Sequence, residues 1–591
     1  MSDYRPPLDD ISFVLKHIVG YDEIAALPGF EHADLDTVEG LMAELSDLVV
    51  EKVAPLNRIG DTEGATWHPD HSVTTPPGFA AAYKAYQEAG WPSVAFPEEY
   101  GGGNFPWAVG LAMQEVLTSA NMAFSLGPLL TQGAIEAISH YGSDEQKATY
   151  LPPMIAGEWS GTMNLTEPQA GSDVGALTAK AVKNPDGSYS ITGQKIFISY
   201  GEHDFTDQKV HLVLARVEGA PAGTAGISCF VVPKYLVNDD GSLGEHNSLK
   251  ALSIEHKMGI HASPTCVMDY DGATGFLLGE ENKGMRIMFV MMNTARLSVG
   301  LEGMCIAERA YQQSLAYATD RIQGTAVGGS EPVAIIEHPD VRRMLMTQKS
   351  QIAALRALML SNAGHMDRAK FHPDAAVRER EAEIVGLLTP ICKSLGTDLG
   401  SELSSLALQI HGGMGFIEET GVAQHYRDVR ITAIYEGTNG IQAADLIGRK
   451  LPVRQGASVA EYLAEMAEVD ADLAAAGDDF ASIRAQYGSA LGTLKTATEW
   501  LLRTGAGGDV NAMLAGSVPY QRMFGLVVSS WLLAREALAA AGTGDATLAE
   551  TKLVLARFHA EQLLPAAGGL LGAVQAGTGD LFALDAAQLG S

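Results

Sequence analysis

Apolar residues recur every three or four positions from about residue 35 to residue 160, a spacing that predicts amphipathic helices. Pro55 ends one such stretch, and a glycine-rich segment over 97–106 interrupts the pattern. The stripe within 37–54 consists of Val38, Leu41, Met42, Leu45, Leu48 and Val49. We therefore expect a helical N-terminal domain over 36–160, preceded by an N-terminal extension over 1–35.

Near residue 160 the pattern changes to short apolar runs that are separated by glycine-rich turns and Asp-Gly pairs. Such runs predict the strands of a small, mostly antiparallel β domain over 161–280. The runs read SYSITG, KIFISY, VHLVLARV, GISCFVVP and CVMDY.

Helical spacing returns after residue 281 and continues to the end of the sequence. We expect a helical bundle domain over 281–452 and an additional helical domain over 453–591. One stripe of the last domain consists of Val459, Tyr462, Leu463, Met466, Val469 and Leu473. The predicted fold class is therefore α+β: a helical domain, a central antiparallel β domain, a helical bundle and an extra C-terminal helical domain.

Composition and charge indicate a globular protein and argue against nucleic-acid binding. Of the 591 residues, 46% are hydrophobic and 19% are charged, as in a globular protein with several cores. The net charge of −31 repels nucleic acid phosphates. Residues 451–591 hold eight Lys and Arg against fifteen Asp and Glu, so no basic nucleic-acid-binding block is expected there.

The four cysteines are scattered, a pattern that predicts neither a disulfide framework nor a metal site. They are Cys229, Cys266, Cys305 and Cys392. The first residues lack a basic region followed by an apolar run, and no uninterrupted apolar run reaches membrane-spanning length. We expect a cytoplasmic protein without a membrane span.

Four loops point to one chemistry. They are MNLTEPQAGSD over 163–173, GQKIFISYG over 193–201, LQIHGGMGF over 408–416 and YEGTNGIQ over 435–442. In this order and spacing, across residues 35–450, they resemble the acyl-CoA dehydrogenase family. The third loop contains Gly-x-Gly but follows a helical segment without a βαβ unit, so it does not indicate a Rossmann site.

The resemblance implies FAD, bound in a cleft between the β domain and a four-helix C-terminal bundle and partly at a subunit interface. It therefore also implies a homo-oligomer, at least a dimer. The implied FAD-binding residues of the β domain are Met163, Leu165, Thr166, Ser172, Phe197 and Ser199. Those of the bundle are Arg321, His338, Gln409, Gly412, Gly413 and Thr438. Phe197 is implied to face the flavin, Ser199 to reach its N5 atom, and Arg321 to pair with the pyrophosphate of a neighbouring subunit.

The resemblance also implies a catalytic base. Glu436 is expected to take the α-proton of an acyl-CoA thioester while a β-hydride passes to flavin N5, which gives a trans-2-enoyl-CoA. The thioester carbonyl is polarised by the backbone N–H of Glu436 and a ribityl hydroxyl. Relatives with a base elsewhere place it before an arginine, here Arg296, but Ala295 in that place has no basic group. The implied acyl-CoA contacts are Ser172, Asn293, Arg296 and Gly437.

The chain departs from the family pattern at five positions in or near these segments. Phe197 and Ser199 stand where tryptophan and threonine are usual, and Tyr200 stands where asparagine is common. Gln323 replaces a threonine, and Gly440 replaces a glutamine that contacts FAD. The last change implies that one contact to FAD is lost or supplied elsewhere.

Length and the C-terminal helical block resemble the large bacterial members of the family, above all the 3-methylmercaptopropionyl-CoA dehydrogenases of dimethylsulfoniopropionate demethylation. This implies oxidation of 3-methylthiopropanoyl-CoA to 3-methylthioacryloyl-CoA, with electron-transfer flavoprotein or a similar acceptor. Met288, Met291 and Met292 suit a thioether-bearing chain, although methionines are as readily ordinary core residues. The alternatives are a broad-range or long-chain fatty acyl-CoA dehydrogenase of β-oxidation, an acyl-CoA oxidase and a DNA-binding relative.

Overall fold

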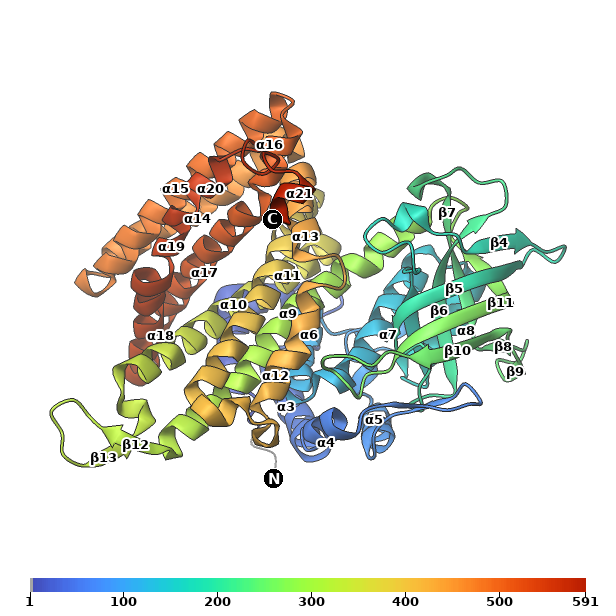
Figure 1. Cartoon of the computed structure of the whole chain (residues 1–591), viewed down its shortest axis with the longest axis horizontal. Helices are drawn as coiled ribbons and strands as arrows, with labels where there is room; N and C mark the ends of the chain where they lie inside the picture. The colour runs from blue at the N-terminus through green and yellow to red at the C-terminus, as the bar shows by residue number, and fades with distance from the viewer. Residues whose placement is uncertain (1–3, 591) are drawn as a thin grey trace. The chain divides into compact units, whose positions relative to one another are not determined.

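The chain folds into two compact units in the computed structural model, which describes residues 4–590 apart from the side chain of Asn293. Unit 1 contains residues 4–6 and Gly40–Ser298, and unit 2 contains Pro7–Glu39 and residues 299–590. The chain passes from one unit to the other within helices α3 (Leu35–Leu48) and α9 (Gly284–Asp320). The expected order of helical, strand and helical segments is confirmed (Figure 1).

The first part of unit 1 is helical. After α3, its helices and one short hairpin are α4 (Leu56–Glu63), β1 (Thr66–Trp67), β2 (Val73–Thr74), α5 (Phe79–Glu88), α6 (Trp107–Ala120), α7 (Met122–Tyr141) and α8 (Asp144–Ile155). Four residues of the predicted stripe are buried, namely Val38, Met42, Leu45 and Val49, while Leu41 and Leu48 are partly buried. Helix α8 begins with a capping box, in which Ser143 and Gln146 satisfy each other's backbone N–H.

Seven strands form the main sheet of unit 1, and five of them close into a ring. The strands are β3 (Trp159–Asn164), β4 (Lys180–Lys183), β5 (Tyr189–Ser199), β6 (Gln208–Val217), β7 (Ile227–Pro233), β10 (Leu249–Ile254) and β11 (Thr265–Leu278). The ring runs β11–β5–β4–β6–β7 and back to β11, while β3 extends β6 and β10 extends β11. A small separate sheet pairs β8 (Tyr235–Val237) with β9 (Leu243–His246).

The strand pairs are mostly antiparallel, as expected, but β3 and β4 each pair with β6 in parallel. Parallel neighbours need a long connection, which the intervening segment between β3 and β6 supplies. Inside the ring, the core includes Ile191, Val213, Phe230 and Met268. A second core packs the other face of the sheet against α7 and α8.

Three long helices dominate the first part of unit 2: α9, α10 (Pro339–Phe371) and α11 (Ala375–His411). Between α9 and α10 lies a short hairpin of β12 (Ile322–Thr325) and β13 (Pro332–Ala334), and after α11 come α12 (Val422–Val429) and α13 (Asn439–Asp445). Helices α9 and α11 touch through glycines. A Cβ on Gly303 would lie 2.2 Å from the carbonyl oxygen of Gly396, so neither position has room for a side chain.

The C-terminal part of unit 2 is helical, as expected. Its helices are α14 (Ala457–Ala475), α15 (Ala481–Ala506), α16 (Val510–Ala515), α17 (Ser517–Ala541), α18 (Ala546–Phe558), α19 (Pro565–Gly569), α20 (Leu571–Gln575) and α21 (Ala586–Leu589). The predicted stripe of α14 is buried along its whole length. Helix α17 is long and apolar enough to cross a membrane by length and composition, but 83% of its most apolar window is buried inside the protein.

The N-terminal extension joins unit 2, where α1 (Leu8–Val14) and α2 (Tyr21–Ala25) pack on α10. A buried ion cluster holds it there. The Lys552 ammonium lies 3.0 Å from Asp10 and 2.6 Å from Glu536, and Arg356 lies 2.8 Å from Glu308. Burial opposes ionisation of Asp10, but Arg356 and Lys552 hold its pKa well below the usual range. Segments from both ends of the chain are thus joined by charge.

Candidate active site

Glu436 lies in a strained turn of unit 2. Its φ is 54°, in the left-handed region, and Gly437 follows with φ 84°. Non-glycine residues adopt this conformation rarely, and such strain concentrates at functional sites. The buried amide of Gln442 donates to the backbone oxygen of Glu436 at 3.2 Å, which helps to hold the turn.

The residues after Glu436 start helix α13. The Thr438 hydroxyl oxygen accepts from the backbone N–H of Ile441 at 3.2 Å and caps the helix. A capping hydroxyl keeps its own proton, so Thr438 is still able to donate to a ligand. Gly440 has no side chain that could contact a ligand. The side-chain amide of the nearby Gln442 donates to the backbone oxygens of Glu436 and Gly437.

Helix α11 anchors the same turn through Asn439. The fully buried Lys393 donates to the Asn439 side-chain oxygen at 2.8 Å, and the Asn439 amide donates to Asp398 at 2.6 Å. Helix α9 provides a further anchor, since the Tyr435 hydroxyl donates to the buried carboxyl of Glu302. Sequence reasoning missed Glu302, Lys393 and Asn439, because each acts through a partner distant in the chain.

A β-bulge presents Phe197 on the surface of unit 1. Between the pairs Cys266–Ile198 and Met268–Lys195, two residues of β5 face one residue of β11. Such bulges re-aim a side chain. Phe197 has φ 61° and is 59% exposed, while Ile198 returns to the core. The aromatic ring expected to face a flavin is therefore directed outward.

The loop after β3 lies beside this bulge. The N–H of Ile196 donates to the Thr166 carbonyl at 2.9 Å, so Thr166 and Phe197 belong to one surface. Thr166, Leu165 and Ser199 are partly exposed, Ser172 is exposed, and Met163 is buried in β3. Thr166 is bonded through its carbonyl to the residue before Phe197, and Ser199 follows Phe197 by two positions, so both hydroxyl-bearing residues neighbour the exposed ring along the backbone. Ser172 lies further along the loop.

A buried ion pair fixes this loop. The fully buried Lys195 donates to the Leu165 carbonyl at 3.0 Å and to Glu167 at 2.8 Å. Glu167 also accepts from the N–H groups of Thr178 and Ala179. Burial opposes ionisation of Glu167, but Lys195 and these donors lower its pKa to about 2. Sequence reasoning missed this pair, although a lysine inside an apolar strand run is a signal that could have found it.

Tyr200, one of the departures from the family pattern, is a structural residue. Its side chain is buried, and its hydroxyl donates to the Ala123 carbonyl at the start of α7 at 2.6 Å. Its φ is 51°, and its N–H donates to Pro264 at 2.7 Å. Tyr200 therefore fixes the end of β5 against the helical part of unit 1.

A polar group collects where α9 ends and α10 begins. Arg321 is exposed and donates to the Gln323 side chain at 3.3 Å, and the His338 ring lies 2.8 Å from the Gln323 carbonyl. The end of α11 lies nearby, since Tyr317 and His411 stack with ring centroids 4.3 Å apart. Gln409, Gly412 and Gly413 are exposed at this end of α11.

The candidate residues of unit 2 thus form two groups. The turn of Glu436 contacts α11 at Lys393, and the Arg321 group lies near α11 at His411. The eighteen residues of helix from one position to the other span about 27 Å. The turn of Glu436 and the group around Arg321 are therefore separate within one chain.

The donor set fits FAD. An exposed aromatic ring with two neighbouring hydroxyls suits the face and polar edge of a flavin, and an exposed arginine suits a pyrophosphate. The residues with these groups are among those that the sequence motifs assigned to FAD, namely Thr166, Phe197 and Ser199 in unit 1 and Arg321 in unit 2.

Asn293 and Arg296 are the residues of α9 that are expected to contact acyl-CoA. Arg296 is 4% exposed, so it is not a solvated surface charge. Ala295 is buried and carries no basic group. The side chain of Asn293 lies outside the described residues. Met288 and Met291 are fully buried in the core beside α7, and Met292 packs at its edge.

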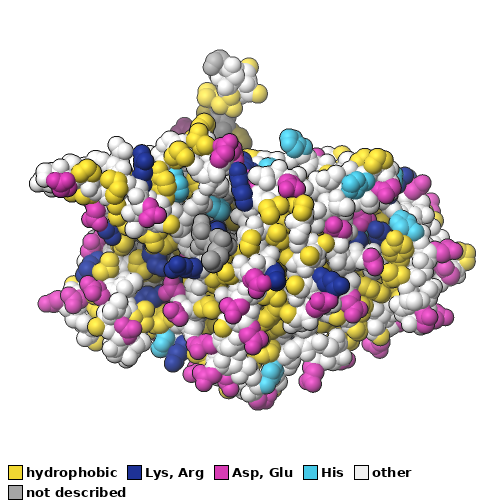
Figure 2. Space-filling view, turned by 90° about the horizontal axis from the view of Figure 1, so that it is seen from below, with side chains coloured by type: hydrophobic (Ala, Val, Ile, Leu, Met, Phe, Trp, Pro, Cys, Tyr) yellow, Lys and Arg dark blue, Asp and Glu magenta, His cyan; other side chains and the backbone are white. Residues whose placement is uncertain are grey.

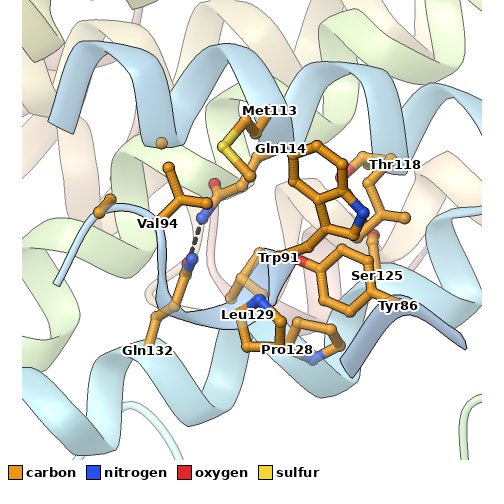
Figure 3. A pocket seen from close by; sticks show the side chains of 14 residues that line it. Tyr86, Trp91, Val94, Met113, Gln114, Thr118, Ser125, Pro128, Leu129 and Gln132 are labelled. Carbon is orange, nitrogen blue, oxygen red and sulfur yellow. Dashed lines mark hydrogen bonds between the residues drawn. The ribbon is translucent and has the colours of Figure 1, made fainter. Parts of the chain in front are cut away.

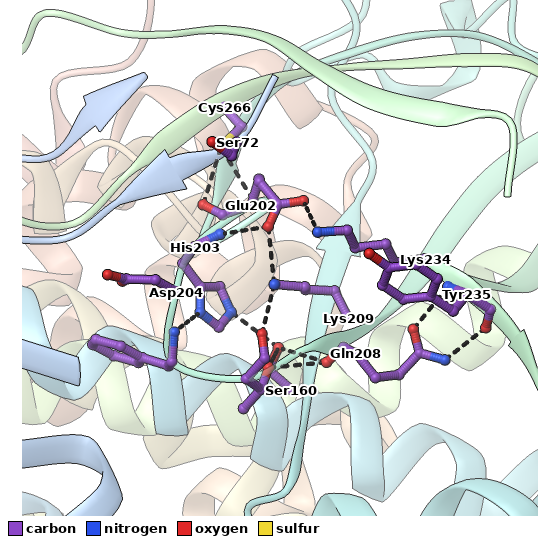
Figure 4. A network of polar contacts seen from close by, with 12 residues as sticks. Ser72, Ser160, Glu202, His203, Asp204, Gln208, Lys209, Lys234, Tyr235 and Cys266 are labelled. Atoms are coloured by element: carbon purple, nitrogen blue, oxygen red, sulfur yellow. Dashed lines mark hydrogen bonds and ion pairs between the residues drawn. The ribbon is translucent and has the colours of Figure 1, made fainter. Parts of the chain in front are cut away.

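A buried Ser–His contact in unit 1 resembles a hydrolase pair but cannot work as one (Figure 4). The His203 Nδ1 atom accepts from the N–H of Phe205 at 3.1 Å, so in the neutral ring Nε2 carries the proton and donates to Ser160 at 3.0 Å. A base would have to accept that bond instead. Glu202 is occupied by Lys209 and Lys234, and the group is buried.

Unit 1 also holds a small pocket among α5, α6 and α7 (Figure 3). Trp91, Met113 and Leu129 contribute to its walls. Its two glutamines are already paired, since Gln114 donates to Gln132 and accepts from Ser298 at 2.8 Å. These contacts tie α6, α7 and the first half of α9 together.

Family models match nearly the whole chain. The N-terminal, middle and C-terminal domains of acyl-CoA dehydrogenase match residues 40–158, 162–273 and 282–451, and an acetyl-CoA dehydrogenase C-terminal-like domain matches 463–585. The chain is 46% identical to 3-methylmercaptopropionyl-CoA dehydrogenase of Ruegeria pomeroyi, over 95% of this chain and 96% of that protein. It is 35% identical to the broad-specificity linear acyl-CoA dehydrogenase FadE5 of Mycobacterium tuberculosis, over 99% and 100%.

A solved structure shows the same fold. Acyl-CoA dehydrogenase complexed with FAD from Bacillus anthracis superposes with a TM-score of 0.73 at 22% identity, over 91% of this chain and 87% of that one. The family models cover the helical domain, the β domain, the bundle and the C-terminal block in the order seen here. The chain therefore belongs to the acyl-CoA dehydrogenase family.

Proposed function

We propose that this acyl-CoA dehydrogenase uses Glu436 to remove the α-proton of a short acyl-CoA, with 3-methylthiopropanoyl-CoA among its best substrates. The observation that carries the assignment of the base is the left-handed turn of Glu436, which is held by α9, by α11 and by Gln442. The substrate is supported by the relative that is 46% identical and bears the corresponding name.

In the proposed reaction, the Glu436 carboxylate takes the α-proton. The backbone N–H of Glu436 points to the thioester carbonyl and stabilises the charge that develops there. Gly437 leaves room along the thioester, and we assign Ser172, Asn293 and Arg296 to contacts with the acyl-CoA. When bound, FAD accepts the hydride from the β-carbon, so that a trans-2-enoyl-CoA is left.

FAD is the cofactor of the family, and we assign its contacts to residues of both units. Those of unit 1 are Met163, Leu165, Thr166, Ser172, Phe197 and Ser199. Those of unit 2 are Arg321, His338, Gln409, Gly412, Gly413 and Thr438. About 27 Å of α11 separates the Arg321 group from the turn of Glu436, which supports an assembly of at least two subunits in which a neighbouring chain supplies Arg321.

The arginine assignment predicts a loss of cofactor. Arg321→Ala should weaken FAD binding by roughly 10- to 100-fold, because a charge-assisted hydrogen bond contributes about 1.5–3 kcal/mol. Dialysis followed by flavin absorbance measures the retained fraction. Arg503→Ala removes an exposed arginine of α15 and should retain FAD fully. Equal retention in both variants would remove Arg321 from the cofactor site.

The substrate assignment is tested with propanoyl-, butanoyl-, 3-methylthiopropanoyl-, octanoyl- and palmitoyl-CoA and an artificial electron acceptor. We expect kcat/KM to be highest for the short chains, with the 3-methylthio substrate among the best. An optimum at sixteen carbons would instead support the long-chain alternative, and a flat profile would support the broad-specificity alternative suggested by the relative that is 35% identical.

Several further assignments complete the proposal. The physiological acceptor is electron-transfer flavoprotein or a similar protein, rather than oxygen as in an oxidase, and the enzyme acts in the cytoplasm. The domain limits are 36–160, 161–280, 281–452 and 453–591, which the family models support. Acidic side chains are spread over the face shown in Figure 2, in line with the net charge of −31, which disfavours the DNA-binding alternative.

A further inference from the structure

Glu302 is a buried carboxyl group beside the proposed base. It lies on α9 with 0% of its surface exposed. One carboxyl oxygen accepts from the Tyr435 hydroxyl, and the other, Oε1, has no hydrogen-bond partner among the described residues. Burying a polar atom without a partner costs roughly 1–3 kcal/mol, so its presence calls for a compensating role.

The groups that face Glu302 come from two elements. Tyr435 and Glu436 approach from the turn, and Lys393 approaches from α11. The glycine contact between α9 and α11 brings the two helices this close. Burial and the charge of Glu436 raise the pKa of Glu302 to about 8, while Tyr435 and Lys393 oppose this shift. Near pH 7 the Glu302 carboxyl is therefore mostly neutral.

A neutral carboxyl suits this place. It accepts the Tyr435 hydrogen bond without adding a second negative charge beside Glu436, which must be ionised to act as a base. Tyr435 is the residue directly before Glu436, so a bond to its ring end restrains the backbone that holds Glu436 at φ 54°. Helix α11 holds the turn at Asn439 and Gln442 holds it at the Glu436 carbonyl, whereas Glu302 holds it at Tyr435.

Resting on the assignment of Glu436 as the base, we propose that Glu302 is a positioning residue that holds Tyr435, and through it Glu436, in the orientation that removes the α-proton. Glu302 does not touch the substrate and transfers no proton to it. Its function is to accept one hydrogen bond while neutral.

Substitutions of Glu302 and Tyr435 test whether their hydrogen bond positions Glu436. Glu302→Leu and Tyr435→Phe should each slow flavin reduction in the FAD-loaded enzyme by about 10- to 100-fold, since a displacement of about 1 Å is able to cost 10²-fold. KM should change little. The double variant should be no slower than the slower single variant, because both changes break the same bond. Full additivity of the two losses would overturn the proposal.

Glu302→Gln provides the rescue. The glutamine carbonyl still accepts from Tyr435, so flavin reduction at pH 7 should remain within about threefold of wild type, a difference that corresponds to less than one kcal/mol. Hydrogen exchange of the amides over 434–438 should be fast in Glu302→Leu and near wild type in Glu302→Gln. A leucine variant with unchanged exchange and unchanged rate would refute the positioning role.

The pH dependence gives a second signature. In the wild type, ionisation of Glu302 near pH 8 adds a negative charge beside Glu436. Because the α-carbon gains negative charge as it passes its proton to Glu436, the rate of flavin reduction should fall through that pH. Glu302→Gln cannot ionise and should lack this step. Identical profiles for the two enzymes would count against the proposal.

Glu308→Gln serves as the control for simple destabilisation. Glu308 is buried on the same helix but pairs with Arg356, away from the turn. This variant should lower the melting temperature without changing the pH profile or the hydrogen exchange over 434–438.

The variants also separate the positioning role of Glu302 from the assignment of Glu436 as the base. If Glu436→Gln abolishes flavin reduction while Glu302→Leu leaves it intact, the base stands and the positioning role fails, whereas a fully active Glu436→Gln removes the base itself.

Discussion

Glu436→Gln is expected to leave FAD and acyl-CoA bound while flavin reduction slows by about 10²–10⁴-fold or more, the usual contribution of a positioned base. Glutamine keeps the size and reach of the side chain but has no basic oxygen able to take the α-proton. The backbone N–H that polarises the thioester is unchanged. The anchors of the turn through Glu302, Asn439 and Gln442 do not involve the Glu436 carboxylate, so its conformation should persist.

Anaerobic mixing with substrate measures this prediction. The wild-type flavin should bleach rapidly, whereas the variant should show a perturbed flavin spectrum without reduction. Glu419→Gln removes an exposed glutamate of unit 2 and should behave as wild type. Bleaching of Glu436→Gln at nearly the wild-type rate would show that another carboxylate is the base, and Ala295 could not replace it.

Lys195→Met is expected to reduce the free energy of unfolding by about 3–5 kcal/mol, the typical cost of leaving one member of a buried ion pair alone. Both side chains of this pair are at most 2% exposed, so water cannot replace the lost cation. The same lysine holds the Leu165 carbonyl, so the loop that carries Thr166 should loosen and FAD should bind more weakly. Methionine keeps most of the volume, which limits the effect to the charge.

The ion pair between Lys195 and Glu167 also predicts how the stability of the protein depends on pH. The folded-state pKa of Glu167 is about 2, below its ordinary value of 4.5, so its stabilising contribution is fully present above pH 4.5. It is lost as the pH falls from 4.5 towards 2. In Lys195→Met the pKa of Glu167 is no longer depressed by the ammonium, so this acid-dependent loss should shrink.

Denaturant unfolding at pH 7 and pH 4, with FAD retention recorded in parallel, tests both statements. Lys180→Met changes an exposed lysine of β4 in the same β domain and should alter stability by less than about 0.5 kcal/mol. A Lys195→Met enzyme as stable as this control would show that the buried pair contributes nothing to the loop.

Local signals account for the parts of the site that could be predicted. Gly437, Thr438 and Glu436 occupy one short segment, and so do Phe197 and Ser199, so a linear motif is enough to select them. The structure adds what such motifs omit. The bulge that turns Phe197 outward depends on the register between β5 and β11, and the caps and anchors of the turn depend on helices far away in the chain.

The sequence by itself determined the order of helical and strand segments, the family and the candidate base, because apolar periodicity and loop motifs are properties of neighbouring residues. Only the tertiary structure decided which buried charges meet. Glu302 and Tyr435 are 133 positions apart, and Asp10 and Lys552 are 542 apart. It also placed the N-terminal extension in unit 2. Pairing over such separations leaves no period in the sequence, since it is the packing of helices that brings these side chains within hydrogen-bond distance.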